Sequence, residues 1–312
     1  MNGQPPPLLD MIGRLIGAPS VSSSQRHLDQ SNLAVIGLLA EWLEGAGFAV
    51  EVMPIPGHTG KANLIATLGR GPGGLVLAGH TDTVPYDAHL WTHDPLRLTE
   101  EAGRLYGLGT SDMKSFLALA IEAARGLAGQ DLGQPLVILA TADEESSMSG
   151  AIALAEAGRP LGRYAVIGEP TGLKPVRMHK GIMAEAIRLI GRSGHSSDPS
   201  LGNNALEGMH ELIGDILTWR RELQTRHRHD AFAVAVPTLN LGHIHGGDSP
   251  NRICGECELH IDLRPTPGLA LDDLRADLHR RVAELAGRRG LDWRVERLFP
   301  GMYVDRYQER AD

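Results

Sequence analysis

The sequence contains little cysteine and few aromatic residues, and it has no long apolar run. Two cysteines in 312 residues exclude a small secreted fold held by disulfides and favour a reducing compartment. The longest apolar stretches, such as residues 75–78, fall far short of the roughly 20 apolar residues that a membrane-spanning helix needs. The first residues lack a positive segment followed by an apolar one. We therefore expect no secretory signal and a cytoplasmic protein.

An excess of basic residues is also absent. Lysine and arginine number 30 against 38 aspartates and glutamates, which gives a net charge of −8 and a pI near 6.0. This balance argues against a nucleic-acid partner and against a membrane-surface protein. The 14 histidines, in contrast, outnumber the 4 Phe, 5 Tyr and 4 Trp together. This excess of imidazole directs the search to metal sites.

Strand and helix patterns alternate through the first half of the chain, which predicts α/β layering. Apolar runs predict buried strands at 75–79 and 136–141 and a further strand at 164–167, and helical spacing predicts helices at 8–16, 31–45 and 113–127. After residue 176 the order becomes strand, helix, strand, strand, helix, as expected for a small α+β domain inserted into the larger one. We predict a first domain at 1–176, an inserted domain at 177–288, and a return to the first domain at 289–312.

Residues able to bind a metal follow three of the predicted strands of the first domain. His80 and Asp82 come after the first strand, Glu144 and Glu145 after the second, and Glu169 after the third. In open α/β sheets, ligands bind beyond the carboxyl ends of the strands. Asp82 can share a face with His80, and a carboxylate beside a ligating imidazole fixes its tautomer.

Each of these features also has an ordinary structural explanation. His80 and Asp82 could form a turn, Asp112 could cap the helix at 113–127, and residues 143–145 could form a solvated acidic loop. Three adjacent acids repel one another, however, so we expect a bound cation to offset their charge. One histidine with several carboxylates suits Zn²⁺, Co²⁺ or Mn²⁺. Because the histidine and the carboxylates all fall at strand ends of one predicted domain, the sequence favours a metal centre.

The motifs resemble those of the M20 family of dizinc metallopeptidases. The matching segments are 79–85, 109–114, 143–145 and 168–171. Within the family, segments 179–181, 194–199, 237–248 and 251–254 resemble the acetylornithine deacetylases of arginine biosynthesis. The resemblance implies a mixed-sheet catalytic domain of the zinc-exopeptidase type. It also implies an inserted ferredoxin-like lid domain, through which a homodimer forms.

The resemblance further implies roles for individual residues. His80, Asp112 and Glu169 would hold one metal, and Asp112 and Glu145 a second, with Zn²⁺ or Co²⁺ as the ion and up to two ions per chain. Glu144 would be the general base and Asp82 would orient His80. His195 would help to stabilise the oxyanion, at a neighbouring subunit's site in dimeric relatives. The acyl amino acid carries an α-carboxylate that a guanidinium can bind in a fork, and the candidates are Arg264 and Arg252, with Asn251 beside them.

Three functions follow from these observations. The leading one is hydrolysis of N2-acetyl-L-ornithine to L-ornithine and acetate. A second is another activity of the family, such as succinyl-diaminopimelate desuccinylase or dipeptidase. Family members continue past the end of this chain with a section that carries a further histidine ligand of the second metal. We therefore expect the second metal site to be incomplete and the activity to be impaired. The third possibility is that the chain is a non-catalytic remnant of the family.

The sequence also contains a close pair of cysteines and a close pair of histidines. Cys254 and Cys257 form a C-x-x-C, but zinc binding would need a second such pair and redox chemistry a helix start. We expect both cysteines to serve packing. His243 and His245 could share a strand face, but no carboxylate partner is evident in the sequence, so we expect pocket or lid residues rather than ligands.

Overall fold

A computed structural model describes residues 4–23, 25–176 and 178–298. The chain divides into two compact units, residues 1–175 and 176–312. The division lies next to the boundary expected at residue 176. None of the helices among the described residues is long and apolar enough to cross a membrane.

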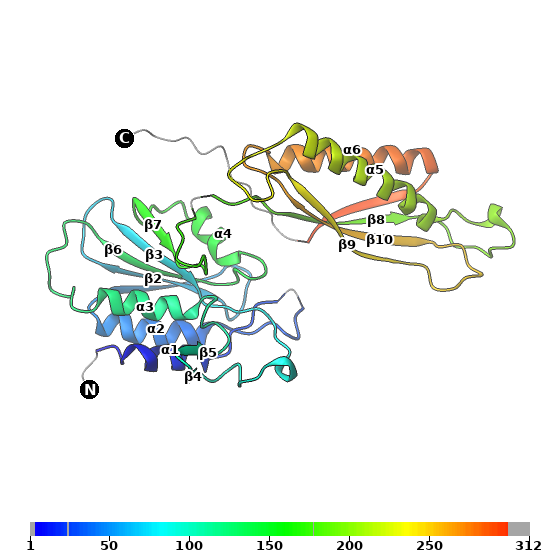
Figure 1. Ribbon diagram of the computed structural model, residues 1–312. Coiled ribbons are helices and arrows are strands. Elements are labelled where there is room, and N and C mark those ends of the chain that lie inside the picture. The colour runs from blue at the N-terminus through cyan, green and yellow to red at the C-terminus, as the bar shows by residue number, and fades with distance from the viewer. Residues whose placement is uncertain (1–3, 24, 177, 299–312) are drawn as a thin grey trace. The chain divides into compact units, whose positions relative to one another are not determined.

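The first unit is built on a mixed five-stranded sheet of order β1-β2-β6-β3-β7 (Figure 1). The strands are β1 (Ala49–Pro54), β2 (Ala62–Leu68), β3 (Leu75–His80), β6 (Leu136–Thr141) and β7 (Tyr164–Ile167). Strand β3 runs parallel to both β6 and β7, whereas β2 is antiparallel to β1 and to β6. The mixed α/β sheet confirms the predicted class. The carboxyl ends of β3, β6 and β7 therefore meet at one edge.

Three helices cover one face of this sheet, and a fourth packs on the other face (Figure 1). The three are α1 (Leu8–Ile16), α2 (Leu33–Gly45) and α3 (Lys114–Ala124), and the fourth is α4 (Ser149–Glu156). The apolar stripe of α1, for example, places Met11, Leu15 and Ile16 in the core. The short segments η1 (Ala88–Leu90), β4 (Thr99–Glu101) and β5 (Arg104–Tyr106) were not predicted.

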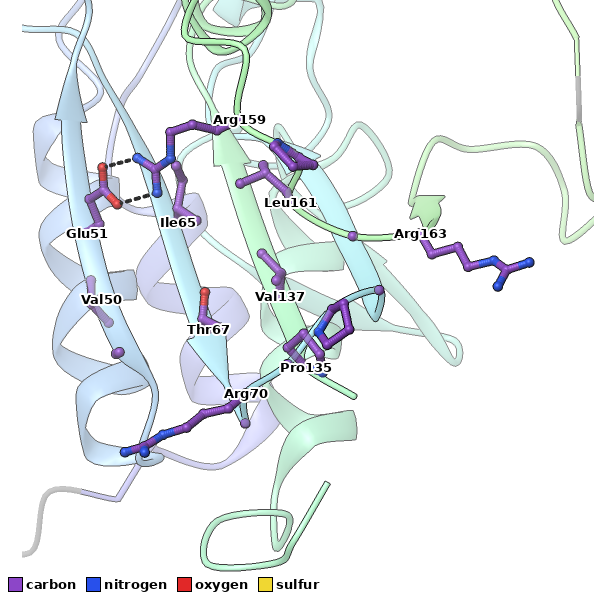
Figure 2. Close-up of a pocket in the computed structure, with 17 residues that line it drawn as sticks. Val50, Glu51, Ile65, Thr67, Arg70, Pro135, Val137, Arg159, Leu161 and Arg163 are labelled. Atoms are coloured by element: carbon purple, nitrogen blue, oxygen red, sulfur yellow. Dashed lines mark hydrogen bonds and ion pairs between the residues drawn. The ribbon is translucent and has the colours of Figure 1, made fainter. Parts of the chain in front are cut away.

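A hollow of about 780 Å³ lies on the sheet of the first unit, near the amino ends of β6 and β7. Its lining includes Thr67, Pro135 and Val137, and the ion pair of Glu51 with Arg159 spans one side (Figure 2). Pro135 precedes β6, and residues 161–163 precede β7, so the hollow is at the amino ends of the parallel strands. It therefore does not contain the residues predicted to bind metal.

The second unit has the order β-α-β-β-α-β of the split βαβ, or ferredoxin-like, motif. Its elements are β8 (Met183–Ile190), the short η2 (Pro199–Leu201), α5 (Ala205–Arg226), β9 (Thr238–Gly246), β10 (Glu256–Arg264), α6 (Leu271–Arg289) and β11 (Asp292–Arg297). The sheet order is β11-β8-β10-β9, and all neighbours are antiparallel. Both helices cover one face (Figure 1).

The end of the described chain corrects the predicted domain limits. We expected residues 289–312 to return to the first domain. Instead β11 pairs with β8 and completes the sheet of the second unit. Its inward side chains, Trp293 and Val295, pack against the core of that unit. The rest of the segment, from residue 299 onward, lies outside the described residues.

The two cysteines are free and buried in the core of the second unit. The Cys254 thiol donates a hydrogen bond to the carbonyl oxygen of Glu256 at 3.0 Å. Burial, with the nearby Cys254, raises the pKa of Cys257 to about 11. These surroundings are those of packed, unreactive thiols.

Cys257 should therefore resist alkylation in the folded protein. At pH 8 a thiol of pKa near 11 is about 0.1% thiolate, against about 25% for an ordinary cysteine. We expect iodoacetamide to label Cys257 roughly a hundred-fold more slowly before unfolding than after it, as followed by mass spectrometry. Labelling at the rate of a free thiol in the native state would show that the pair is accessible and reactive.

Candidate metal centre

His80 is the last residue of β3 and is almost fully buried. Its Nδ1 lies 3.0 Å from the carbonyl oxygen of Asp82 and 3.5 Å from the Asp82 Oδ1. A proton on Nδ1 therefore donates to Asp82, and Nε2 is turned towards the carboxylates beyond the strand. Asp82 therefore lies beside the Nδ1 side of the ring.

The Nε2 of His80 faces two of the expected carboxylates. It lies 3.0 Å from Asp112 Oδ1 and 3.8 Å from Glu169 Oε1. One ligand atom of each of these three residues falls within 4.8 Å of the others. Asp112 is not the cap of the following helix, because α3 begins at Lys114 and its N-cap is Met113. The capping explanation of Asp112 was wrong.

Glu169 is held by a close approach between β7 and α3. It follows Gly168, where a Cβ atom would come within 2.0 Å of the Phe116 ring. A side chain at position 168 would therefore push the end of β7 away from α3. Glycine at this position brings the Glu169 carboxylate to the edge where His80 lies.

A second group at the same edge combines His80 with Glu144 and Glu145, again within 4.8 Å. The backbone N–H of Glu145 donates to Asp82 Oδ2 at 3.0 Å, which ties this loop to the end of β3. Burial, reinforced by repulsion from Asp112, raises the pKa of Glu145 to about 7 although His80 opposes the shift. Burial likewise raises the pKa of Glu144 and of Glu169.

These donors fit a divalent cation. Burial alone would lower the pKa of His80, but Asp82, Glu144 and Glu169 raise it to about 10. The Oδ1 of Asp82 is buried and has no hydrogen-bond partner among the described residues. Imidazole nitrogen and carboxylate oxygen are the ligands of Zn²⁺ and of neighbouring transition metals.

The first acid of the triplet is neutralised differently from our expectation. We expected a bound cation to offset residues 143–145, but Asp143 is paired with the buried Lys61, whose Nζ lies 2.6 Å from Oδ1. The hydroxyls of Ser22 and Ser149 also donate to the Asp143 carboxylate, at 3.0 and 2.8 Å. Asp143 has a φ of +56°, in the left-handed region. This anchored residue sets the start of the loop that presents Glu144 and Glu145.

Lys61 was missed by the sequence reasoning. It directly precedes β2, and its partner lies 82 positions further along the chain. A lysine before a strand is ordinary, and no spacing connects it with the acidic triplet. Only the antiparallel pairing of β2 with β6 brings the two residues together.

The remaining predicted residues belong to the second unit. His195 forms an isolated antiparallel bridge with Arg252, and the Ser196 N–H donates to the Asn251 carbonyl at 3.0 Å. Arg252 pairs with Asp248 at 2.5 Å, while Arg264, at the end of β10, pairs with Asp262 at 3.0 Å. The structure thus brings His195, Asn251 and Arg252 together, with Arg264 in a separate ion pair.

Comparison with known proteins places this chain in a family. The profile of peptidase family M20/M25/M40 matches residues 76–303, which is most of the chain. The chain belongs to the M20/M25/M40 peptidase family. Members of this family are metal-dependent hydrolases, and the match includes every residue that we placed at the metal centre.

Solved structures share the fold of this chain. A tripeptidase of Staphylococcus aureus superposes with a TM-score of 0.67 at 19% identity, over 97% of this chain and 78% of its own. Human carnosine dipeptidase 1 gives 0.64 at 18% identity, over 95% and 78%. A dinuclear metal-binding peptidase of Bacillus subtilis gives 0.59 at 18% identity, over 96% and 75%. At these identities the likeness shows the fold.

Proposed function

We propose that this M20 protein removes the acetyl group from N2-acetyl-L-ornithine, giving L-ornithine and acetate. The observation that carries amide hydrolysis is the cluster of His80, Asp112, Glu169, Glu144 and Glu145 at one sheet edge. The choice of substrate rests on the sequence of the second unit, where segments 179–181, 194–199, 237–248 and 251–254 resemble the acetylornithine deacetylases.

Each residue of the cluster has a proposed task. His80, Asp112 and Glu169 would hold one ion, and Glu145 with Asp112 would contribute to a second, with Zn²⁺ or Co²⁺ as the ions. Bound divalent ions supply water activation and polarisation of the scissile carbonyl.

Glu144 is left free to move the proton. Its carboxylate takes a proton from the attacking water and passes it to the departing amine. Burial raises its pKa, because the charged form is poorly solvated there, while His80 opposes the shift and Asp82 favours it. A more basic carboxylate is a better proton acceptor at neutral pH.

We further propose that His195 donates a hydrogen bond to the oxyanion. The Ser197 N–H donates to its Nδ1 at 3.2 Å, so a neutral ring carries its proton on Nε2 and can offer it to a ligand. His195→Ala should lower kcat by about 10²–10³ with a smaller change in KM. A loss confined to KM, measured by steady-state kinetics, would remove this role.

For the substrate α-carboxylate we propose Arg264 first and Arg252 second, with Asn251 beside Arg252. Each guanidinium is paired with a neighbouring exposed aspartate, and an ion pair of this kind is weak enough to exchange for a ligand. Lysine in place of the true partner loses the two-pronged contact. We expect Arg264→Lys to raise KM sharply and Arg252→Lys to raise it less. Unchanged KM in either variant excludes that arginine.

A panel of substrates tests the proposed specificity. We expect kcat/KM to be highest for N-acetylornithine, compared with succinyl-diaminopimelate and with simple dipeptides. The dipeptidase alternative has support from the fold neighbours, which include a dipeptidase and a tripeptidase. Faster succinyl release or faster dipeptide cleavage would reverse the assignment while leaving the metal-dependent hydrolysis intact.

A further inference from the structure

We infer that the second unit carries a metal site of its own, formed by His243, Glu258 and His260. One ligand atom from each residue lies within 4.8 Å of the other two. The residues come from β9 and β10, and none belongs to the metal centre of the first unit. The inference does not depend on the proposed deacetylase activity.

The site lies on the sheet face that the helices leave open. Cys257, Leu259 and Ile261 of β10 are buried in the core with α5 and α6. Side chains alternate along a strand, so Glu258 and His260 point to the opposite face. The helices lie on one side of this sheet (Figure 1). Glu258 and His260 are half-buried and His243 is exposed, so an ion from solvent can reach them.

A bulge brings His243 to this face. Leu241 pairs with Ile261, and simple antiparallel register would then place Gly242 opposite His260. The register shifts between His260 and Ile261, so His243 stands opposite His260 instead. An extra residue reverses which face the following side chains occupy. The two imidazole rings consequently lie side by side, with centroids 4.6 Å apart.

The spacing suits a small transition-metal ion. Two ligands at about 2.0–2.1 Å from zinc, at a tetrahedral angle, lie roughly 3.3 Å apart. His260 Nε2 and Glu258 Oε1 are now 2.8 Å apart and share a hydrogen bond. A metal can replace that proton after a small separation of the two side chains.

Arg188 supports the carboxylate from the other side. Its Nε and Nη2 both donate to Glu258 Oε2, at 2.8 and 2.5 Å, which leaves Oε1 directed at His260. Partners of this kind orient a ligand without binding the metal. Glu256 lies 3.4 Å from the same guanidinium and offsets its charge. Glu256, Glu258 and Arg188 together carry a net charge that is negative, and this charge favours the binding of a cation.

The donor set selects the class of ion. Two imidazoles and one carboxylate suit Zn²⁺, Cu²⁺ or Ni²⁺, whereas Ca²⁺ and Mg²⁺ prefer oxygen alone. Three protein ligands leave one position open, as in sites that bind a fourth, exchangeable ligand.

Modification of histidine by diethylpyrocarbonate tests the inference residue by residue. The full chain is treated with and without Zn²⁺, and each histidine is followed by mass spectrometry. We expect Zn²⁺ to protect His243 and His260 while His210, an exposed histidine on α5, stays reactive. Equal reactivity of His243 and His260 with and without Zn²⁺ would overturn the inference, as would equal protection of His210.

Variants separate this site from the first unit. In His243→Ala and in Glu258→Gln, Zn²⁺ should no longer protect His260, and equilibrium dialysis should show one Zn²⁺ fewer per chain. His210→Ala is the matched control and should lose none. An unchanged zinc count in His243→Ala, in protein with the wild-type circular dichroism spectrum, contradicts the inference. The readouts report binding and not turnover, so a failure here leaves the proposed hydrolysis untouched.

Discussion

Replacing Glu144 with glutamine should lower kcat by about 10²–10⁴ while metal binding stays as in the wild type. The amide keeps the size of the side chain but cannot accept the proton of the attacking water. The pKa of Glu144 is raised because its carboxylate is buried among other acids, a setting suited to a proton acceptor. Initial rates with the preferred substrate, together with metal counts on the same samples, measure the effect.

The metal count separates the two roles open to Glu144. Glu144 lies close to His80 and Glu145, so Glu144 could itself be a metal ligand. If Glu144→Gln loses metal together with activity, Glu144 binds the ion and is not the base. Glu122→Gln is the control, because Glu122 is a partly exposed residue of α3 that pairs with Arg125. Its rate and its metal count should be those of the wild type.

Replacing Lys61 with methionine should destabilise the first unit by about 3 kcal/mol. Methionine has a similar length but no charge, so the buried Asp143 carboxylate would lose the ammonium that neutralises it. The two serine hydroxyls would remain, but neutral donors compensate a buried charge only in part. Urea unfolding in the presence of a chelator measures the change without a contribution from bound metal.

Two comparisons show whether the buried charge is the cause. Asp29 also contacts Lys61, at 2.8 Å, but is a third exposed. We expect Asp29→Asn to cost less than about 1 kcal/mol. The double variant Lys61→Met, Asp143→Asn has neither of the two buried charges. Its loss of unfolding free energy should be smaller than the sum of the losses in the two single variants. Simple additivity in this cycle would mean that Lys61 and Asp143 do not stabilise each other.

Strong apolar patterns made much of the fold predictable. The strands 136–141 and 164–167 and the helix 8–16 have the limits that their patterns indicate. β11 was missed because only Trp293 and Val295 face the core while four charged residues surround them.

The candidate metal centre was predictable for a different reason. His80 ends one strand, whereas Glu144, Glu145 and Glu169 follow two others, and parallel strands bring such positions together. Contacts across antiparallel pairs leave no comparable pattern in the sequence. Lys61 meets Asp143 only through the pairing of β2 with β6. No carboxylate partner of His243 was evident in the sequence, because only a bulge and the register with β10 bring Glu258 close.

The most direct test of the account is turnover of N-acetylornithine by purified chain, followed as metal is removed and returned. We predict that chelation abolishes turnover, that added Zn²⁺ or Co²⁺ restores it, and that the restored activity is absent from His80→Ala. The plot of activity against bound metal then gives the number of ions that hydrolysis needs. Folded, metal-loaded protein that cleaves neither N-acetylornithine nor the other substrates of the panel would contradict the account. That result would favour a family member that binds metal without catalysis.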